Sequence, residues 1–595
     1  MPVDQTLHWA DPLGTGPLFT QYTGPVPLTT HVHGALVEPE SDGGPETWYT
    51  PGYAIKGPHA TKEVYEYNNQ QLPATIWYHD HGFGVDRLNV YMGLAGYYLI
   101  TDPEFEAPLN LPSAPYDMGI CIQDRMFNTG GSFLYPGNGI NPDIHPFWIP
   151  EFFGDVMLAN GKVWPYLNVE PRKYRFRFLN GCNARFLELR LFDRVNYVPG
   201  PAFYQIGTDG GYLAAPVMLN DPTSPKAPRL LFAPGERCDV IIDFAGLAVG
   251  TKLTLVNSAK APYPNGTAPN PMTTGQIMEF RVIPLSAPDE SSIPSSITTI
   301  PTLTPGPVTR TLTLNEVEGP LGPLAALLDG RTWHHPITEM PILGSTEIWE
   351  IVNLTADAHP IHLHGVQFQL LNRQMFNRTK YLKVYNKLNP IIPIPEDATY
   401  TTVLPGPYLQ GPAMPPDPNE AGWKDTFRMN PGQVTRAIIR FAFQDGSPYA
   451  DVFDATAEPG YVWHCHILEH EENDMMRPFK MVAEPSFVAG NNITPATFPE
   501  SDQSSFSRLA IYPNPFNLTA VISYNLPATS QVSLNVYNIM GQKVKTLVDA
   551  FEAAGNKTVT WNGTNQSGEN VASGLYFLRL ETASGTAVKR ATLLK

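Results

Sequence analysis

The stretch YVWHCHILEHEENDMM (residues 461–476) places a cysteine between two histidines, then adds a third histidine and two methionines. Side chains i and i+2 of an extended strand point to the same face, so His464 and His466 would face one way and Cys465 the other. Such a cysteine is a packed hydrophobe, half of a disulfide or a metal ligand. The other histidines of the chain decide among these possibilities.

Ten of the 15 histidines fall in four short blocks that each contain His-x-His: THVHG (30–34), WYHDHG (77–82), HPIHLHG (359–365) and HCHILEH (464–470). A single His-x-His is weak evidence, because core or surface histidines explain most such pairs. Four pairs on strands offer eight imidazoles side by side, more than one metal ion needs, and they predict a metal cluster. The eight are His31, His33, His79, His81, His362, His364, His464 and His466.

The blocks also contain two histidines and a cysteine outside this set of eight, and a methionine follows the last block. These residues predict a second metal site, formed by His359, Cys465, His470 and Met475. Two histidines, one thiolate and a weak axial methionine are the ligands of blue-copper sites, whereas structural zinc prefers several thiolates. The backbone of Cys465 runs directly to histidines of the cluster, so this residue would also give electrons a short covalent path between the sites. Five histidines outside the blocks show no partner pattern: His8, His59, His145, His334 and His335.

Composition predicts an all-β fold with long loops. The 595 residues include 61 Pro and 48 Gly, only 16% are charged, and 42% are hydrophobic, which is enough to fill cores. The net charge of −17 argues against nucleic acid or an anionic membrane surface as a partner. No hydrophobic run is long enough to span a bilayer, and the opening MPVDQTLHWADPLG shows no signal peptide.

The chain length predicts several domains, and linker-like stretches divide it into four β units. The linkers are EFEAPLNLPSAP (104–115), the Pro/Ser/Thr-rich 284–307 and AGNNITPATFPESDQSS (489–505). The predicted units are residues 1–104, 116–285, 308–488 and 507–595. All predicted metal ligands lie in the first and third units.

Four cysteines are too few for a disulfide framework. If Cys465 binds metal, at most one intrachain disulfide can form among Cys121, Cys182 and Cys238. We expect it between Cys182 and Cys238.

The sequence around these blocks resembles the multicopper oxidases, and among them the bacterial spore-coat laccase and bilirubin oxidase branch. The resemblance covers residues 1 to about 485 and rests on HVHGALVEPESDGGPETWYTPG, IWYHDHGFGVDRLNVYMGLAGYYLITDP, LANGKVWPYLNVEPRKYRFRFLNG, GWKDTF and YVWHCHILEHEENDMMRP. It implies three cupredoxin-like Greek-key β-sandwich domains, with a copper cluster between the first and third.

The resemblance also implies four copper ions and their ligands. Type 1 copper would take His359, Cys465, His470 and Met475, and type 2 copper would take His31 and His362. The type 3 pair would take His33, His79, His81, His364, His464 and His466. Glu471 resembles the acid beside bound dioxygen, and Asp42 resembles the acid that orders water at type 2 copper. Both would handle the protons that dioxygen reduction consumes.

The chain departs from the family pattern at both ends. Only about 28 residues precede THVHG, fewer than in the family, so we expect the first domain to lack a strand or more. The tail, with IYPNPFNLTAVISYNLP, VYNIMGQKVKTLVD and VASGLYFLRL, resembles the sorting domain of type IX secretion. That resemblance implies a small Ig-like β-sandwich and a secreted or cell-surface protein that meets the secretion machinery. An ordinary Ig-like appendage is the alternative.

The resemblance implies a monomeric laccase-like oxidase. A phenol or aromatic amine would give electrons to type 1 copper through an exposed edge of His470 or His359, and dioxygen would be reduced to water. A metallo-oxidase of Cu(I) or a bilirubin oxidase is the alternative within the family, and the insertion at 375–416 would shape the substrate entrance. A surface copper-binding protein with little turnover is the alternative from another class.

Overall fold

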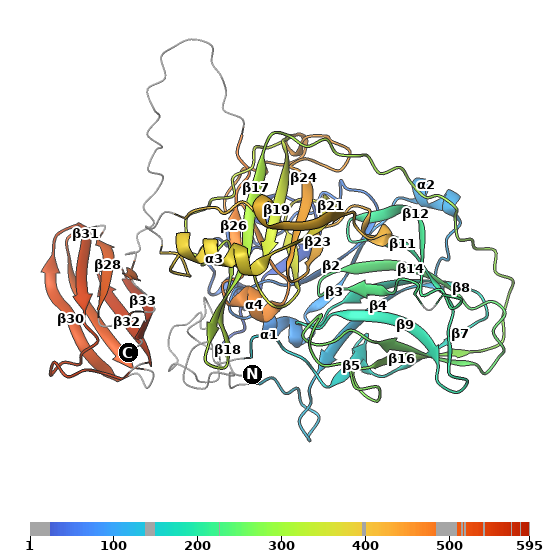
Figure 1. Cartoon of the computed structure of the whole chain (residues 1–595), viewed down its shortest axis with the longest axis horizontal. Coiled ribbons are helices and arrows are strands. Elements are labelled where there is room, and N and C mark those ends of the chain that lie inside the picture. The colour runs from blue at the N-terminus through green and yellow to red at the C-terminus, as the bar shows by residue number, and fades with distance from the viewer. Residues whose placement is uncertain are drawn as a thin grey trace, which may run out of the picture.

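The structure is a computed structural model that describes residues 24–136, 149–224, 226–395, 400–483 and, with short interruptions, 509–593. Nearly all of the regular structure in these residues is β-sheet, which confirms the all-β prediction (Figure 1). The α-helices in the described residues are short: α1 (Asp86–Tyr91), α2 (Pro103–Glu106), α3 (Arg378–Leu388) and α4 (Leu468–Glu472). Single 3-10 turns occur at Pro39–Ser41, Pro51–Tyr53, Ala107–Leu109, Gly406–Tyr408, Pro418–Glu420 and Tyr449–Asp451.

The first unit contributes a three-stranded antiparallel sheet of β1 (Thr30–His33), β2 (Ala74–Asp80) and β3 (Ala95–Ile100), in that order. Apolar residues such as Val32, Ile76 and Ile100 pack on one side of it. The predicted shortening of this unit concerns residues 1–23, which lie outside the described residues.

The second unit is a sandwich of two larger sheets. One sheet has the order β12-β11-β14-β8-β4-β5-β6, and the other has the order β10-β9-β15-β16-β7 with β13 beside β9. Burial alternates along β9 (LELRLFD), as expected for a strand with one face in the core. The strands are β4 (Asp117–Arg125), β5 (Val156–Ala159), β6 (Lys162–Val163), β7 (Tyr166–Val169), β8 (Lys173–Asn180), β9 (Leu187–Asp193), β10 (Val198–Pro199), β11 (Phe203–Thr208), β12 (Gly211–Leu219), β13 (Leu230–Phe232), β14 (Arg237–Asp243), β15 (Lys252–Asn257) and β16 (Gln276–Val282).

The expected disulfide between Cys182 and Cys238 is wrong, because all four cysteines are free thiols. Both residues are buried in the core of the second unit, where they pack as small hydrophobes. Strand pairing places Cys238 of β14 opposite Phe178 of β8, whereas Cys182 lies beyond the end of β8.

The third unit is also a sandwich, with sheets ordered β18-β17-β19-β24-β21-β22 and β23-β20-β25-β26. Trp349 and Trp463, one from each sheet, meet edge to face with ring centroids 5.6 Å apart, so the core lies between the sheets. The strands are β17 (Thr309–Gly319), β18 (Gly322–Leu328), β19 (Thr346–Asn353), β20 (His359–Leu363), β21 (Phe368–Phe376), β22 (Leu409–Met414), β23 (Thr426–Met429), β24 (Gln433–Arg440), β25 (Tyr461–Cys465) and β26 (Met476–Phe479).

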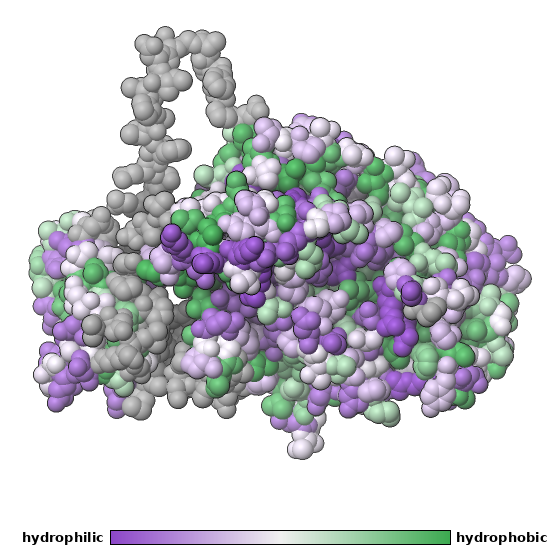
Figure 2. All heavy atoms as spheres, in the orientation of Figure 1, coloured by the Kyte–Doolittle hydropathy of each residue, from purple (hydrophilic) through white to green (hydrophobic). Residues whose placement is uncertain are grey.

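Part of the insertion predicted at 375–416 forms helix α3. Tyr381 and Tyr385 are its buried residues, while Lys380 and Lys383 are exposed. Figure 2 shows hydrophilic residues gathered over this helix, on a face where polar and apolar residues are otherwise intermixed. The helix therefore covers the third unit with one apolar side and presents a basic side outward.

The C-terminal unit consists of two sheets, β27-β28-β31 and β30-β29-β32-β33, around a core that contains Leu534, Trp561 and Leu578. The strands are β27 (Leu509–Tyr512), β28 (Ala520–Leu526), β29 (Ser530–Asn538), β30 (Lys543–Glu552), β31 (Gly555–Trp561), β32 (Gly574–Thr582) and β33 (Gly585–Leu593). Each strand in the described part of the chain lies inside one of the four predicted units, while the exact boundaries stay predictions. No helix among the described residues is long and apolar enough to cross a membrane.

Candidate metal centre

Strand pairing brings the four His-x-His pairs together. In the first unit, β1 and β2 pair antiparallel so that His31 lies opposite His79. In the third unit, β20 and β25 pair so that His362 lies opposite His464. The remaining histidines lie on or directly beyond the ends of these strands, and all eight are at most 1% exposed. The alternation of side chains along a strand thus presents both members of each pair to one site, as predicted.

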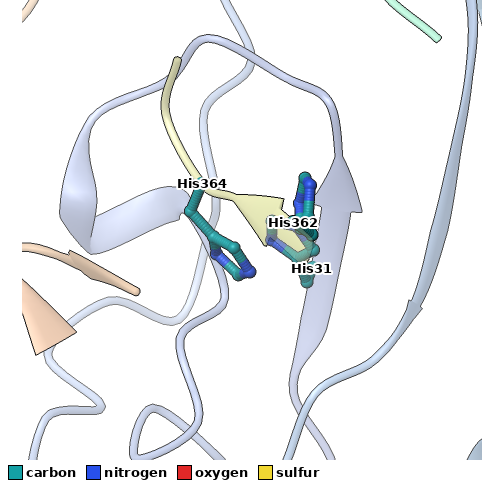
Figure 3. Close-up of side chains that lie close together, drawn as sticks. All are labelled: His31, His362 and His364. Atoms are coloured by element: carbon teal, nitrogen blue, oxygen red, sulfur yellow. The ribbon is translucent and has the colours of Figure 1, made fainter. Parts of the chain in front are cut away.

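The imidazoles of the first unit stack on those of the third. The ring centroids of His33 and His362 are 3.6 Å apart, and those of His31 and His364 are 3.8 Å apart. Figure 3 shows His31 on its strand facing His362 and His364 at the end of β20. The histidines predicted to form a cluster therefore meet where two units of the chain are in contact.

Two groups of three histidines stand out within the cluster. The Nε2 atoms of His81, His364 and His464 lie 3.1–3.2 Å from one another. The ring centroids of the second group lie 5.0–5.7 Å from one another, and its members are His33, His79 and His466. The pair His31 and His362, with centroids 5.7 Å apart, belongs to neither group.

The hydrogen bonds of the cluster suit a bound cation. Four Nδ1–H groups donate to main-chain carbonyl oxygens, which can only accept, so the Nε2 atoms of these rings carry lone pairs. The Nε2 atoms of His31, His79 and His362 are buried and have no hydrogen-bond partner among the described residues. Buried lone pairs without a donor are unfavourable unless a metal ion takes them. The four bonds are His31 to Asp42 O (2.6 Å), His79 to Asp80 O (2.7 Å), His362 to Asp425 O (2.8 Å) and His464 to Cys465 O (3.1 Å).

The structure also brings together three of the residues predicted for the second site. Cys465 Sγ lies 3.6 Å from His359 Nδ1 and 3.8 Å from His470 Nδ1, and these two nitrogens are 3.2 Å apart. Met475 is buried in the same core, and its main chain bonds to that of Cys465 and of His470 (both 2.9 Å). A thiol and two imidazoles this close, all buried, are suited to a metal that accepts sulfur and nitrogen ligands.

Burial disfavours the protonated form of histidines in both sites. It lowers the pKa of His79 to about 4 and that of His470 to about 3. Burial also lowers the pKa of His359 and raises the pKa of the Cys465 thiol. Neutral imidazole is the form that binds metal, and a metal ion would displace the proton of the thiol.

Both predicted carboxylates lie beside the cluster. Glu471 Oε2 is 2.9 Å from His464 Nδ1, and Oε1 is 3.3 Å from His81 Nε2. Burial acts to raise the pKa of Glu471, but proximity to His464 outweighs it, so the pKa lies below its ordinary value. The Asp42 carboxyl lies 2.7 Å from His364 Nδ1, and burial raises its pKa well above the ordinary value.

Two polar contacts to the ligands were not predicted from the sequence. Asp425 Oδ1 lies 3.0 Å from His33 Nε2, and Thr355 Oγ1 lies 2.6 Å from His359 Nε2. Asp425 belongs to the quoted motif GWKDTF, but nothing in that motif indicates which histidine it meets.

The histidines outside the four blocks take other contacts. His59 pairs with Glu46 (3.1 Å), and His335 contacts the main chain of Ile394 (2.5 Å). His8 and His145 lie outside the described residues.

One thiol and two histidines lie beside a cluster of eight buried histidines, and consecutive residues of one chain segment join the two sets. These side chains match the ligands of copper sites in β-sheet proteins. Comparison with known proteins identifies the family. Residues 329–484 match the model of the multicopper oxidase family. The chain is 41% identical over 485 residues to a laccase of Bacillus subtilis (strain 168). The matched region covers 80% of this chain and 83% of that laccase.

Other relatives agree. The chain is 36% identical over 490 residues to multicopper oxidase LPR1 of Arabidopsis thaliana, with 81% and 79% of the two chains covered. The crystal structure of McoA multicopper oxidase from Aquifex aeolicus matches with a TM-score of 0.57 and 27% identity, covering 78% of this chain and 85% of that one. The chain therefore belongs to the multicopper oxidase family. It is an oxidoreductase of laccase type that uses oxygen, on a cupredoxin-like fold.

The C-terminal unit has a different relationship. Residues 518–586 match the model of the FlgD Ig-like domain. This match confirms the predicted Ig-like character of the unit, which carries none of the predicted metal ligands.

Proposed function

We propose that the chain binds four copper ions and couples the oxidation of phenols or aromatic amines to the reduction of dioxygen to water. The observation that carries the proposal is the convergence of His359, Cys465 and His470 directly beside the eight-histidine cluster. Copper at these ligands would supply one-electron chemistry at the first site and dioxygen reduction at the second. Cys465 lies between His464 and His466 in sequence, so covalent bonds connect the two sets of ligands.

The proposed ligands follow the groups that the hydrogen bonds and ring contacts define. His359, Cys465 and His470 would hold the blue-copper ion, with Met475 as a further ligand from the same core. The pair His31 and His362 would hold one ion, and each group of three histidines would hold another. The Nε2 atoms of His31 and His362 have no hydrogen-bond partner among the described residues, which supports the assignment of one ion to this pair.

Acidic groups beside His359 favour a reductant with positive charge, such as a protonated aromatic amine. Glu316 Oε1 lies 3.8 Å from His359 Nε2, and burial, with Asp357 nearby, raises the pKa of Glu316 to about 8. A cation that displaces this proton would gain a carboxylate partner. The sequence predicted that electrons enter through an exposed edge of His470 or His359. Little of either ring is exposed, because His359 is fully buried and His470 is only 3% exposed.

Glu471 and Asp42 are proposed to handle protons. Dioxygen reduction consumes protons as well as electrons, and a positioned carboxyl group can deliver them. Glu471 contacts one ring nitrogen of His81 and one of His464. Asp42 contacts a ring nitrogen of His364. Each carboxyl group is thus within hydrogen-bonding reach of the cluster.

Oxidation of Cu(I) is the second candidate, because the same acidic groups beside His359 suit a small cation. A bilirubin oxidase and a copper-binding protein without turnover are the remaining alternatives. We further propose that the protein is a monomer with a secreted or cell-surface location, and that its Ig-like unit meets a type IX secretion machinery. The resemblance of the tail sequence to type IX sorting domains supports the proposed location.

The first test is a visible and near-ultraviolet spectrum of copper-loaded protein, followed by oxygen uptake with a phenol, an aromatic amine and Cu(I). An intense blue band with a near-ultraviolet shoulder and phenol- or amine-dependent oxygen uptake are expected. Uptake with Cu(I) alone would favour the metallo-oxidase. Folded, copper-loaded protein without a blue band would refute the role of Cys465.

A further inference from the structure

The second unit supplies no predicted metal ligand, yet one of its arginines reaches the cluster. Arg237, at the start of β14, is fully buried, and all five of its N–H groups are used. Nε donates to Thr75 O on β2 (3.0 Å), the strand that also carries His79. The two terminal nitrogens donate to Gly235 O and Asp209 O in the second unit (2.9 and 3.1 Å) and to the Asp425 carboxylate in the third (2.9 and 2.5 Å). One side chain of the second unit therefore contacts both the first and the third unit.

Asp425, which Arg237 holds in place, contacts two histidines of the cluster. Its main-chain oxygen accepts from His362 Nδ1, and its Oδ1 lies 3.0 Å from His33 Nε2. Thr426 Oγ1, also 3.0 Å from His33 Nε2, donates its proton to the same Oδ1 (2.9 Å). Both oxygens facing His33 Nε2 are therefore acceptors, so this nitrogen carries the proton.

The protonation of Nε2 leaves Nδ1 of His33 as the atom with a lone pair. That atom is buried without a hydrogen-bond partner among the described residues. His31, His79, His362 and His464 have the opposite arrangement, with the proton on Nδ1 and the lone pair on Nε2. His33 is thus held in the reverse tautomer by a carboxylate that lies 392 residues further along the chain.

Glycines allow this close approach of the units. Gly34 follows His33 with φ +92°, and a Cβ there would lie 2.5 Å from Asp425 Oδ2 and 2.9 Å from a terminal nitrogen of Arg237. A Cβ on Gly235 would lie 2.7 Å from the ring of His466. The turn before β14 therefore packs directly on the cluster, with space for no larger residue.

We propose that Arg237 of the second unit is a positioning residue for the copper cluster. It holds the Asp425 carboxylate against His33, fixes the tautomer in which His33 Nδ1 is the ligand atom, and so couples the second unit to copper binding in the other two. The inference rests on the proposed assignment of His33 as a copper ligand.

The test compares Arg237→Lys with Arg175→Lys. Arg175 is a matched control, because it is a buried arginine of the second unit that binds Asp239 through Nε (3.0 and 3.1 Å). The other polar partners of its side chain among the described residues are Tyr212, Glu106 and Asp117, and none of the cluster histidines is among them. Lysine keeps the charge but cannot form the planar fork that binds both carboxylate oxygens. The readouts are copper per chain at buffered free copper, and the ratio of the near-ultraviolet shoulder to the blue band.

Arg237→Lys is expected to lower the copper affinity of the cluster by roughly 10- to 100-fold, the range typical for partners that orient metal ligands. The blue band serves as an internal reference, because His359, Cys465 and His470 have no contact with Asp425. The shoulder should therefore fall relative to the blue band in Arg237→Lys and keep the parent ratio in Arg175→Lys. Unchanged ratio and copper content in Arg237→Lys, or an equal loss of both bands in the two variants, would overturn the proposal.

A double variant, Arg237→Met with Asp425→Leu, covers the case in which the single variant does not fold. It removes both partners and leaves no unpaired buried charge, which proteins tolerate better than the loss of one partner. It should keep the blue band and lose the shoulder, and retention of both would refute the positioning role. A parent protein that shows the blue band without the shoulder would instead refute the ligand assignment of His33, and this inference with it.

Discussion

Glu469 lies in helix α4, which also carries His470. The burial of its carboxyl group predicts how the free energy of unfolding depends on pH. Its carboxylate is fully buried and accepts hydrogen bonds from Tyr135 Oη and Asn183 Nδ2 (both 2.8 Å) and from Phe152 N (3.2 Å). Burial raises the pKa of Glu469 to about 7, despite these bonds. The unfolded chain releases the same proton at about pH 4.3.

The free energy of unfolding should therefore depend on pH through this residue. Between about pH 4.3 and pH 7 the folded state holds a proton that the unfolded state has lost, so the free energy of unfolding falls as pH rises and then levels off above pH 7. Each pKa unit is worth about 1.4 kcal/mol, so the whole effect is about 3.7 kcal/mol, of which about 2 kcal/mol develops between pH 5.5 and pH 9.

Glu469→Gln keeps the shape of the side chain and removes the titration. The difference in unfolding free energy between this variant and the parent should shift by about 2 kcal/mol in favour of the variant between pH 5.5 and pH 9. Urea unfolding of the copper-free proteins, followed by tryptophan fluorescence, measures this shift. Parallel pH profiles for variant and parent would refute the assigned burial of an ionisable Glu469.

Three further predictions concern the copper sites and the third unit. Cys465→Ser should lose the blue band and keep the near-ultraviolet shoulder, because the cluster histidines bind copper without the thiolate; a blue band that persists in the spectrum contradicts the ligand assignment. Removal of copper with a chelator should lower the melting temperature, since saturating copper at about 1,000 times its Kd stabilises the folded state by about 4 kcal/mol, and superimposable calorimetric scans would contradict copper binding to the folded chain. Glu420→Gln should reduce the unfolding free energy by roughly 3 kcal/mol, because it weakens the buried ion pairs of Glu420 with Arg373 and Arg428 (both 2.7 Å). A loss below about 1 kcal/mol in urea unfolding would show that the pairs are compensated in the folded variant.

Local sequence predicted much of the candidate site. A strand places residues i and i+2 on one face, so His464 and His466 turn to the cluster while Cys465 turns to His359 and His470, as expected. The all-β fold follows equally from short strand patterns between prolines and glycines. These features depend on a few neighbouring residues, whose geometry the backbone fixes wherever the strand lies.

Tertiary structure decided what depends on residues far apart in the sequence. One group of three histidines brings His81 to His364 and His464, which lie hundreds of residues away in the sequence. No local sequence pattern predicts this grouping. The expected disulfide failed for the same reason, since strand register places Cys238 opposite Phe178. The tautomer of His33 depends on Asp425, and Asp425 depends on Arg237 from a unit without ligands. Hydrogen bonds that select a ring nitrogen form only after the units pack, because burial removes the water that would otherwise satisfy either nitrogen.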